Sequence, residues 1–285
     1  MKAQLIDGKL ISAEIKAEAA EEAAALKEQG IEPCLAVVLV GDNSASKVYV
    51  SNKEKACAAV GIRSVSHVLP EATTEEELLK LIDELNADKS VHGILVQMPV
   101  PKHIDDRKVI MAISPDKDVD CFHPVNVGYL HTGAKGFLPC TPAGIIELIK
   151  RSGHSIAGKN CVVIGRSNIV GKPVAMLLMQ ENGTVTICHS KTKDLAGICR
   201  GADIIVSATG KVDTVTADMV KEGAIIIDVG MNRNAEGKLC GDVDFENVKE
   251  VAGAITPVPG GVGPMTIAML MKNCNTAARI QNGLL

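Results

Sequence analysis

Short apolar runs alternate with longer helix-forming segments along most of the chain. The segment CLAVVLVG (34–41) is a continuous apolar run that ends in glycine, which is typical of a strand buried on both faces. Thr74 and Glu77 form a capping box, which predicts that a helix begins beside them. In this first part of the chain, the other expected strands are 63–69 and 93–97, and the other expected helices are 12–28 and about 44–59. The alternation predicts a parallel α/β sheet.

A polar stretch at 114–140 interrupts this pattern, which then resumes. The stretch is long for a structureless connection, which favours a functional role. Thr141 and Pro142 predict the start of the next helix, with Thr141 as its N-terminal cap. The expected strands beyond this point are 161–165, 184–188, 202–209 and 223–230, and the expected helices include 171–181 and 265–281. The economical interpretation is two α/β domains separated by the polar stretch.

The segment GRSNIVG (165–171) follows a buried strand and opens a helix, which is where a Rossmann fold binds a pyrophosphate. The match to GxGxxG is imperfect because Ser167 stands at the second glycine position, and a strand–glycine–helix turn is also common without any ligand. The next strand ends in ICHSKTK (187–193), without the carboxylate that binds the ribose of NAD. Ser190 and the neighbouring lysines, with Arg166, favour the 2′-phosphate of NADP, although an exposed basic loop would read the same way.

Tyr49 and Lys53 lie four residues apart, and therefore on one face of the expected helix 44–59. A tyrosine ring and a lysine amine suit a heteroaromatic substrate that undergoes proton transfer, although a tyrosine in the core under a surface lysine is the commoner meaning of this spacing. Gln97 closes the strand 93–97 at its carboxyl end, where α/β proteins bind ligands, or merely caps that strand. TPVPGGVGPMT (256–266) permits close backbone approach to a ligand, or forms a rigid hinge.

Composition and charge narrow the function classes. The 285 residues carry a net charge of −4, which argues against nucleic-acid and anionic-membrane partners. Nine scattered cysteines without a CxxC pair indicate reduced thiols in a cytoplasm. The first residues lack the apolar core of a signal peptide, and no apolar run is long enough to span a membrane. The dispersed histidines and carboxylates match no metal cage, so we expect no metal.

Seven segments, in order, resemble the tetrahydrofolate dehydrogenase/cyclohydrolase family over essentially the whole chain. They are VGDNSASKVYVSNKEKA (40–56), HGILVQMPVP (92–101), PDKDVD (115–120), PCTPAG (139–144), VVIGRSNIVGKP (162–173), DVGMN (228–232) and TPVPGGVGPMT (256–266). One departure is that Cys121 replaces the glycine that usually follows the KDVD motif. A positive φ at this position would strain the cysteine and affect the placement of Asp120.

The resemblance implies two α/β domains that form a cleft. Residues 1–140 and the C-terminal helix 265–285 would form a folate-binding catalytic domain, and 141–264 a Rossmann NADP-binding domain. The implied catalytic and folate-binding residues are Lys53, its partner Gln97, the ring-stacking Tyr49, the pterin-anchoring Asp120, and Pro259, Gly260 and Gly261. The implied cofactor-binding residues are Gly165, Arg166, Ser167, Ser190 and Met231.

The implied activity is oxidation of 5,10-methylenetetrahydrofolate with NADP and hydrolysis of the methenyl product to 10-formyltetrahydrofolate. The family context implies one-carbon metabolism that supplies purine biosynthesis, in a cytoplasmic homodimer. Three alternatives remain: a dehydrogenase with little or no cyclohydrolase activity, another Rossmann dehydrogenase of amino-acid or shikimate type, and a non-catalytic folate- or NADP-binding regulator.

Overall fold

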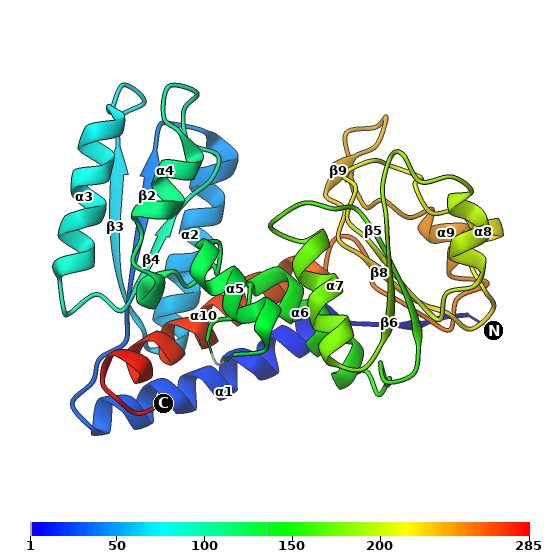
Figure 1. Ribbon diagram of the computed structural model, residues 1–285, viewed down its shortest axis with the longest axis horizontal. Coiled ribbons are helices and arrows are strands. Elements are labelled where there is room, and N and C mark those ends of the chain that lie inside the picture. The colour runs from blue at the N-terminus through cyan, green and yellow to red at the C-terminus, as the bar shows by residue number, and fades with distance from the viewer. Residues whose placement is uncertain (1, 135) are drawn as a thin grey trace. The chain divides into compact units, whose positions relative to one another are not determined.

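The chain folds into two compact units, each built from two separate segments. The computed structural model describes residues 2–134 and 136–285, with only the backbone of residues 44 and 45. The six-stranded unit contains the N-terminal residues up to Ala13 together with Thr141–Thr266. The three-stranded unit contains Glu14–Cys140 and Ile267–Leu285. Figure 1 shows both units.

The six-stranded unit alternates strands and helices. Its sheet strands are β1 (Gln4–Leu5), β5 (Asn160–Ile164), β6 (Thr184–Cys188), β7 (Ile204–Ser207), β8 (Ile225–Asp228) and β11 (Ala254–Ile255). A hairpin pairs β9 (Asn232–Arg233) with β10 (Leu239–Cys240). The helices are α6 (Cys140–Arg151), α7 (Gly171–Gln180), α8 (Leu195–Arg200), α9 (Phe245–Val248) and the 3-10 turn η2 (Ala217–Met219).

All strand pairs of the six-stranded sheet are parallel, in the order β1-β11-β8-β7-β5-β6. The chain runs outward from β5 to β6 and then returns to β7 on the other side of β5. The strand order therefore reverses between β5 and β7. In open α/β sheets, ligands bind outside the carboxyl ends of the strands at such a reversal.

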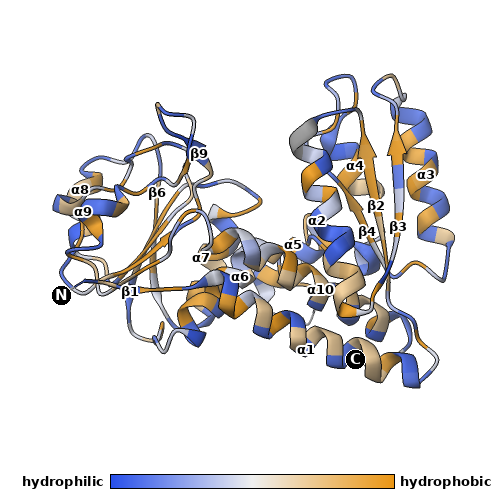
Figure 2. Ribbon diagram, turned by 180° about the vertical axis from the view of Figure 1, so that it is seen from behind, coloured by the Kyte–Doolittle hydropathy of each residue, from blue (hydrophilic) through white to orange (hydrophobic). Residues whose placement is uncertain are grey.

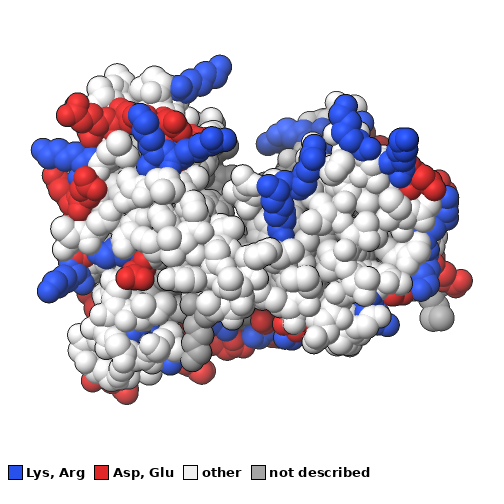
Figure 3. All heavy atoms as spheres, in the orientation of Figure 1, with Lys and Arg blue, Asp and Glu red and all other residues white. Residues whose placement is uncertain are grey.

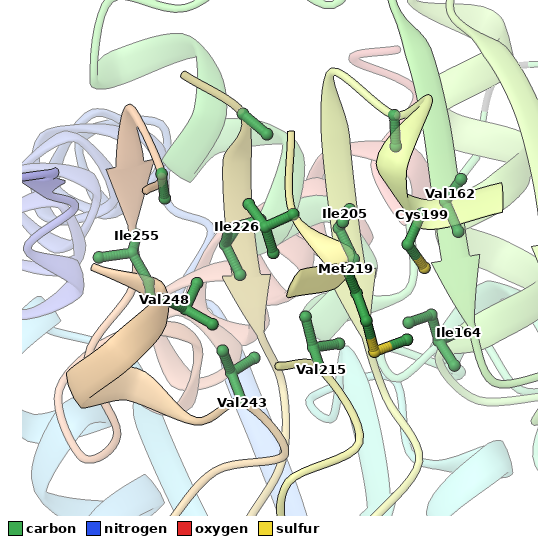
Figure 4. Packing of buried hydrophobic residues seen from close by; sticks show 14 of the residues in the cluster. Val162, Ile164, Cys199, Ile205, Val215, Met219, Ile226, Val243, Val248 and Ile255 are labelled. Atoms are coloured by element: carbon green, nitrogen blue, oxygen red, sulfur yellow. The ribbon is translucent and has the colours of Figure 1, made fainter. Parts of the chain in front are cut away.

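An aliphatic core packs against this sheet. Figure 4 shows side chains from β5, β7, β8 and β11 directed into one layer, where they meet the segments that carry Val215, Met219 and Val248. No Trp occurs in the chain, and branched aliphatic side chains fill this layer. Such close packing gives the strand ends a rigid base, which a binding site at the sheet edge requires.

The three-stranded unit is a smaller α/β layer. Its strands are β2 (Cys34–Val40), β3 (Arg63–Leu69) and β4 (Gly93–Val96), all parallel in the order β3-β2-β4. Its helices are α2 (Ser44–Val60), α3 (Glu75–Ala87), α4 (Asp106–Ala112), α5 (Pro124–Thr132) and the 3-10 turn η1 (Pro115–Lys117), with most of α1 (Gly8–Glu28) and α10 (Val262–Gln281). Strand β2 is buried along its whole length, and Figure 2 colours it as hydrophobic throughout.

The predicted α/β fold with two domains and a Rossmann-type second domain is confirmed, with three local differences. Strand β1 pairs with β11, so the first residues of the chain lie in the six-stranded unit and not with the segment that follows them. Helix α6 already begins at Cys140, and Thr141 is therefore inside its first turn instead of capping it. The polar stretch 114–140 contains the helix α5, which the pattern did not predict.

No described helix combines the length and the apolar character needed to cross a membrane. Within the described ranges, no group of three or more His, Cys, Asp or Glu side chains is arranged to hold a metal ion. Each of the nine cysteines is a free thiol.

Candidate active site

Lys53 lies on the buried face of helix α2. The buried positions of this helix include Ser46, Val50, Lys53, Cys57 and Val60, which are three or four residues apart and follow one helical stripe. Lys53 belongs to the same stripe and is only 9% exposed. A lysine in a stripe otherwise made of small and apolar side chains needs a polar partner, because burying an ammonium without one is costly.

That partner is Gln97, at the carboxyl end of β4. The Lys53 Nζ donates a hydrogen bond of 2.9 Å to the Gln97 Oε1. The Gln97 Nε2 donates to the Met98 carbonyl at 2.8 Å, and the Gln97 backbone N–H donates to the Val38 carbonyl at 2.8 Å. Both ends of the amide are therefore engaged, and its oxygen is held toward the lysine. The chain runs from β2 to the edge strand β3 and returns to β4, so the reversal point of this sheet lies between β2 and β4.

Asp120 supplies a carboxylate near the same lysine. Burial raises the pKa of Asp120, the positive charge of Lys53 opposes that rise, and the neighbouring Asp118 adds to it. The Cys140 Sγ lies 3.9 Å from the Asp120 Oδ1. An amine, an amide and a carboxylate thus meet at one end of the three-stranded unit, which is a set of groups suited to binding a heterocycle and moving a proton.

The loop that carries Asp120 is held by the Asp118 carboxylate. Its two oxygens accept hydrogen bonds from the backbone N–H groups of Phe122 (3.2 Å) and His123 (2.8 Å), and the Asn126 side chain donates to it at 2.9 Å. Cys121 adopts a left-handed conformation with φ of +60°, and its thiol lies 3.2 Å from the carbonyl of Phe137. The positive φ considered from the sequence is therefore present, on a residue type that rarely adopts it.

Tyr49 lies one helical turn before Lys53 on α2 and is 40% exposed. A partly exposed ring beside a buried amine has a face on which a planar group can stack. By spacing alone, a tyrosine in the core is the commoner interpretation, and the exposure of Tyr49 argues against it.

At the carboxyl end of β5, the chain turns sharply into helix α7. Gly165 has a φ of +125°, and a Cβ there would lie 2.4 Å from the Ala208 carbonyl oxygen at the end of β7. The Ser167 hydroxyl accepts hydrogen bonds from the N–H groups of Val170 and Gly171, both at 3.2 Å. This leaves the hydroxyl hydrogen of Ser167 available as a donor. The turn lies at the reversal point of the sheet and allows close backbone approach to a ligand.

The register of two strands brings Arg166 and Ser190 to neighbouring places. Ile164 of β5 pairs with Cys188 of β6, so Arg166 and Ser190 each lie two residues beyond a matched pair. Both residues are exposed. On the face of this unit seen in Figure 3, Lys and Arg side chains gather on the loops at the end where Figure 1 places β9. A donor, a guanidinium and this positive charge fit the 2′-phosphate of NADP.

Two buried carboxylates organise the loops at the end of β7 and β8. Burial raises the pKa of Asp228 to about 6, although three backbone N–H groups donate to its carboxylate, those of Gly230, Asp242 and Val243. Asp242 in turn accepts from the N–H groups of Thr209 at 2.6 Å and Lys211 at 3.0 Å. These bonds hold the two loops in place next to the Gly165 turn.

A cavity of about 340 Å³ lies beside these loops, within the six-stranded unit. Met231, Pro259, Gly260 and Gly261 line it, and so does Lys9 from the start of α1. Gly260 has a φ of +106°, and a Cβ on Gly261 would lie 2.6 Å from the Pro257 carbonyl oxygen. The glycines are therefore required for this turn, whatever it binds.

The structure groups the predicted site residues into two sets. Lys53, Gln97, Asp120 and the nearby Tyr49 belong to the three-stranded unit. Gly165, Arg166, Ser167, Ser190, Met231, Pro259, Gly260 and Gly261 belong to the six-stranded unit. Sequence reasoning missed Cys140, Asn273 and Lys9 as residues that contact these sites. Cys140 lies in the PCTPAG motif, which was a usable signal, whereas nothing in the local pattern marked Lys9 or Asn273.

A parallel sheet with a glycine turn at its reversal point, and a hydroxyl and basic side chains after the next strand, is typical of a dinucleotide-binding α/β fold. The family model of the tetrahydrofolate dehydrogenase/cyclohydrolase catalytic domain matches residues 6–120. The model of the NAD(P)-binding domain of the same family matches residues 139–282. The chain therefore belongs to the tetrahydrofolate dehydrogenase/cyclohydrolase family.

Similar proteins span the full length of the chain. The bifunctional protein FolD of Agathobacter rectalis is 63% identical over 277 residues, which are 97% of this chain and 99% of that protein. The crystal structure of the bifunctional FolD dehydrogenase/cyclohydrolase from Campylobacter jejuni has a TM-score of 0.95 and 54% identity, covering 98% of this chain and 99% of that one. The Trypanosoma brucei enzyme, solved with NADP and an inhibitor, has a TM-score of 0.92 and 42% identity, covering 98% of each chain.

Proposed function

We propose that the chain oxidises 5,10-methylenetetrahydrofolate to 5,10-methenyltetrahydrofolate with NADP⁺, and then hydrolyses the product to 10-formyltetrahydrofolate. One observation carries the residue assignment: Lys53 lies on a buried helix stripe, hydrogen-bonded to Gln97 and within electrostatic reach of Asp120. The family membership supports the two reactions, and the relative solved with NADP supports the cofactor.

In this proposal, the three-stranded unit binds the folate. Tyr49 stacks its exposed ring on the aminobenzoyl part of the substrate, and Asp120 accepts hydrogen bonds from N–H groups of the pterin. Pro259, Gly260 and Gly261, for which the family resemblance implies folate contact, line the cavity of about 340 Å³ in the six-stranded unit. In the first reaction, a hydride leaves the methylene bridge, and bound NADP⁺ supplies the acceptor. The residues contribute by holding the substrate in the reactive orientation.

In the second reaction, Lys53 assists the addition of water. The water oxygen bonds to the bridging carbon, and one water proton is taken up by the lysine amine. The hydroxyl of the adduct then loses its proton as the formyl C=O bond forms. The bond between that carbon and N5 breaks with its electron pair staying on N5, and N5 receives one proton, so that one proton is released to solvent overall. Gln97 holds the amine in position, since its oxygen is fixed by the bonds that its amide makes to β4 and β2.

NADP would bind at the carboxyl edge of the six-stranded sheet. The Gly165 turn accommodates the pyrophosphate, and the Ser167 hydroxyl hydrogen remains free to donate to it. Arg166 and Ser190 would bind the 2′-phosphate, and Met231 would make a further contact with the cofactor. The residues present fit NADP, because a Cβ at position 165 would close the turn, and because a guanidinium and a hydroxyl each follow the paired strands β5 and β6 by two residues.

We also propose that the enzyme works as a cytoplasmic homodimer in one-carbon metabolism, where its product supplies purine biosynthesis. Strand β3 is at the edge of the described three-stranded sheet, with Val68 61% exposed, and an edge strand can pair with a second copy. Light scattering of the purified chain tests the dimer, and a monomer at micromolar concentration would contradict it.

The function is tested by one assay with methylenetetrahydrofolate and either NADP⁺ or NAD⁺, in which methenyl product is followed as it accumulates and decays. We expect formation with NADP⁺ and subsequent hydrolysis. Accumulation without decay would favour a dehydrogenase alone, and no turnover would favour a non-catalytic binder or a different substrate.

The Lys53→Met variant tests the proposed catalytic residue in the same assay. Methionine keeps the length of the side chain and removes the amine, so we expect cyclohydrolase activity to be abolished. Added methenyltetrahydrofolate provides the direct measurement. Hydrolysis by Lys53→Met at close to the wild-type rate would refute the assignment.

A further inference from the structure

Asn273 is a buried amide on helix α10, at the level of the Asp120 loop. Its Nδ2 donates to the carbonyl of Val119 and to the carbonyl of Leu138, both at 2.8 Å. The side chain is 6% exposed. An amide nitrogen has two hydrogens, so these two bonds use its full donor capacity.

The two carbonyls belong to the segments that surround the Asp120 carboxylate. Val119 immediately precedes Asp120 in the chain. Leu138 is two residues before Cys140, whose Sγ lies 3.9 Å from the Asp120 Oδ1 and 3.5 Å from the Asn273 Nδ2. One side chain from a helix late in the sequence therefore joins the two backbone segments on which the position of Asp120 depends.

Asp120 itself lies in a turn, outside the helices and strands, and the bonds of the Asp118 carboxylate hold only the residues that follow it. The segment continues into Cys121, which is strained by its φ of +60°. Burial also disfavours the charge on Asp120. Keeping the ionised carboxylate in this place therefore costs free energy, which other contacts of the loop must offset. Two short hydrogen bonds from a packed helix hold the backbone against both effects.

We propose that Asn273 is a positioning residue that holds Asp120 in the orientation needed to bind the pterin. This inference rests on the proposed function of Asp120 in folate binding. Asn273 does not touch the substrate in this proposal. It acts through the Val119 and Leu138 carbonyls, so its loss weakens folate binding while the cofactor site is unaffected.

The same helix provides a matched control. Asn275 is also a buried asparagine of α10, and its Nδ2 donates at 2.7 Å to the Ala19 carbonyl on α1. Replacing either asparagine by alanine removes a buried amide and should destabilise the three-stranded unit to a similar extent. Only Asn273 contacts the Asp120 segments, so only its replacement should alter the binding of folate.

The test uses the full chain with Asn273→Ala, Asn275→Ala, Asp120→Asn and the double variant of positions 273 and 120. We expect Asn273→Ala to raise the KM for methylenetetrahydrofolate about tenfold, as expected for two lost hydrogen bonds, with the KM for NADP⁺ unchanged. Asn275→Ala should keep both KM values. Adding Asn273→Ala to Asp120→Asn should raise the folate KM by less than twofold, because the residue acts through Asp120.

A wild-type folate KM in Asn273→Ala, equal KM changes in the two asparagine variants, or fully additive effects in the double variant would overturn the inference. If Asn273→Ala does not fold, Asn273→Gln retains a buried amide displaced by one methylene, and the same rise of the folate KM is expected. Failure of the proposed function is seen separately, since it would appear as no turnover by the wild-type chain or an unchanged folate KM in Asp120→Asn.

Discussion

Replacing Cys121 by glycine and by alanine measures the backbone strain next to Asp120. At an ordinary buried position, changing alanine to glycine costs about 0.5–1 kcal/mol of backbone entropy. The lost methyl group costs about 0.8 kcal/mol more. At position 121 the φ of +60° opposes these costs, because a left-handed conformation disfavours a residue with a Cβ by about 1–2 kcal/mol. We therefore expect the Gly and Ala variants of Cys121 to have nearly equal stability.

Both variants should be less stable than the wild type, since each removes a thiol that is 2% exposed and lies beside the Phe137 carbonyl. The loss from deleting one buried heavy atom is about 1 kcal/mol. Urea unfolding followed by far-ultraviolet circular dichroism gives the midpoints. Cys199, buried in α8 with a negative φ, provides the comparison, and there the glycine variant should be less stable than the alanine variant by about 1.5 kcal/mol.

A Cys121→Gly variant that is less stable than Cys121→Ala by as much as the Cys199 pair would refute the reasoning on strain. The KM for methylenetetrahydrofolate provides a second readout. Glycine adopts the same φ without strain, so Cys121→Gly should keep the wild-type KM. A valine at 121 cannot adopt that conformation cheaply and should raise the KM by displacing Asp120.

Three further predictions concern the cofactor and the folate sites. Ser190→Asp should shift the ratio of kcat/KM for NADP⁺ to kcat/KM for NAD⁺ by about 100-fold or more toward NAD⁺. The new carboxylate would repel the 2′-phosphate, since two unit charges 4 Å apart repel by about 4 kcal/mol near a protein surface before salt screening. An unchanged ratio would argue against the proposed 2′-phosphate site. Burial raises the pKa of Asp120, so protonation of this carboxyl group as the pH falls should raise the folate KM. The folded state binds the proton more tightly than the unfolded state, and the stability of the wild type relative to Asp120→Asn should therefore decrease as the pH rises through that pKa. Equal pH profiles of the two proteins would contradict this. Gly165→Ala should lower the free energy of unfolding by about 3 kcal/mol or more and weaken NADP binding, because its Cβ would meet the Ala208 carbonyl. Gly158 has a φ of +74° and no atom within 4 Å of the place where a Cβ would lie, so Gly158→Ala should lower the free energy of unfolding by only about 1 kcal/mol. Similar losses of stability in the two variants would be decisive against the close approach.

Local signals predicted most of the helices and strands. The continuous apolar run at β2 and the capping box of α3 are present in the structure, where the Thr74 hydroxyl accepts from the Glu77 N–H and the Glu77 carboxylate accepts from the Thr74 N–H. Helix α5 was missed because PVNVGYLHT contains β-branched residues and an internal glycine, which are weak helix formers. The His123 side chain caps it by accepting from the Val125 N–H at 3.2 Å.

Contacts between distant parts of the chain could not be predicted from local pattern. Strand β1 has two exposed residues, Gln4 and Leu5, and no periodicity, and its partner β11 lies about 250 residues away. Asn273 has the same limitation, since its partners are more than 130 residues earlier. Lys53 and Gln97 were found through their motifs, and the structure adds the hydrogen bond between them. Their catalytic roles, and those of the cofactor residues, stay predictions that the assays above test.

Each compact unit takes one of its two segments from far along the chain, and this has a consequence for folding during synthesis. The three-stranded unit contains Glu14–Cys140 but also Ile267–Leu285, and it cannot be completed until residues 267–285 have left the ribosome. The six-stranded unit must keep its first strand unpaired until β11 is made, near residue 255. In many proteins an N-terminal domain folds while the rest is still being translated, but here no unit formed by the early residues alone can complete its fold in that way. Neither unit is complete before residue 255 has been made, so both units depend on contacts between early and late parts of the sequence.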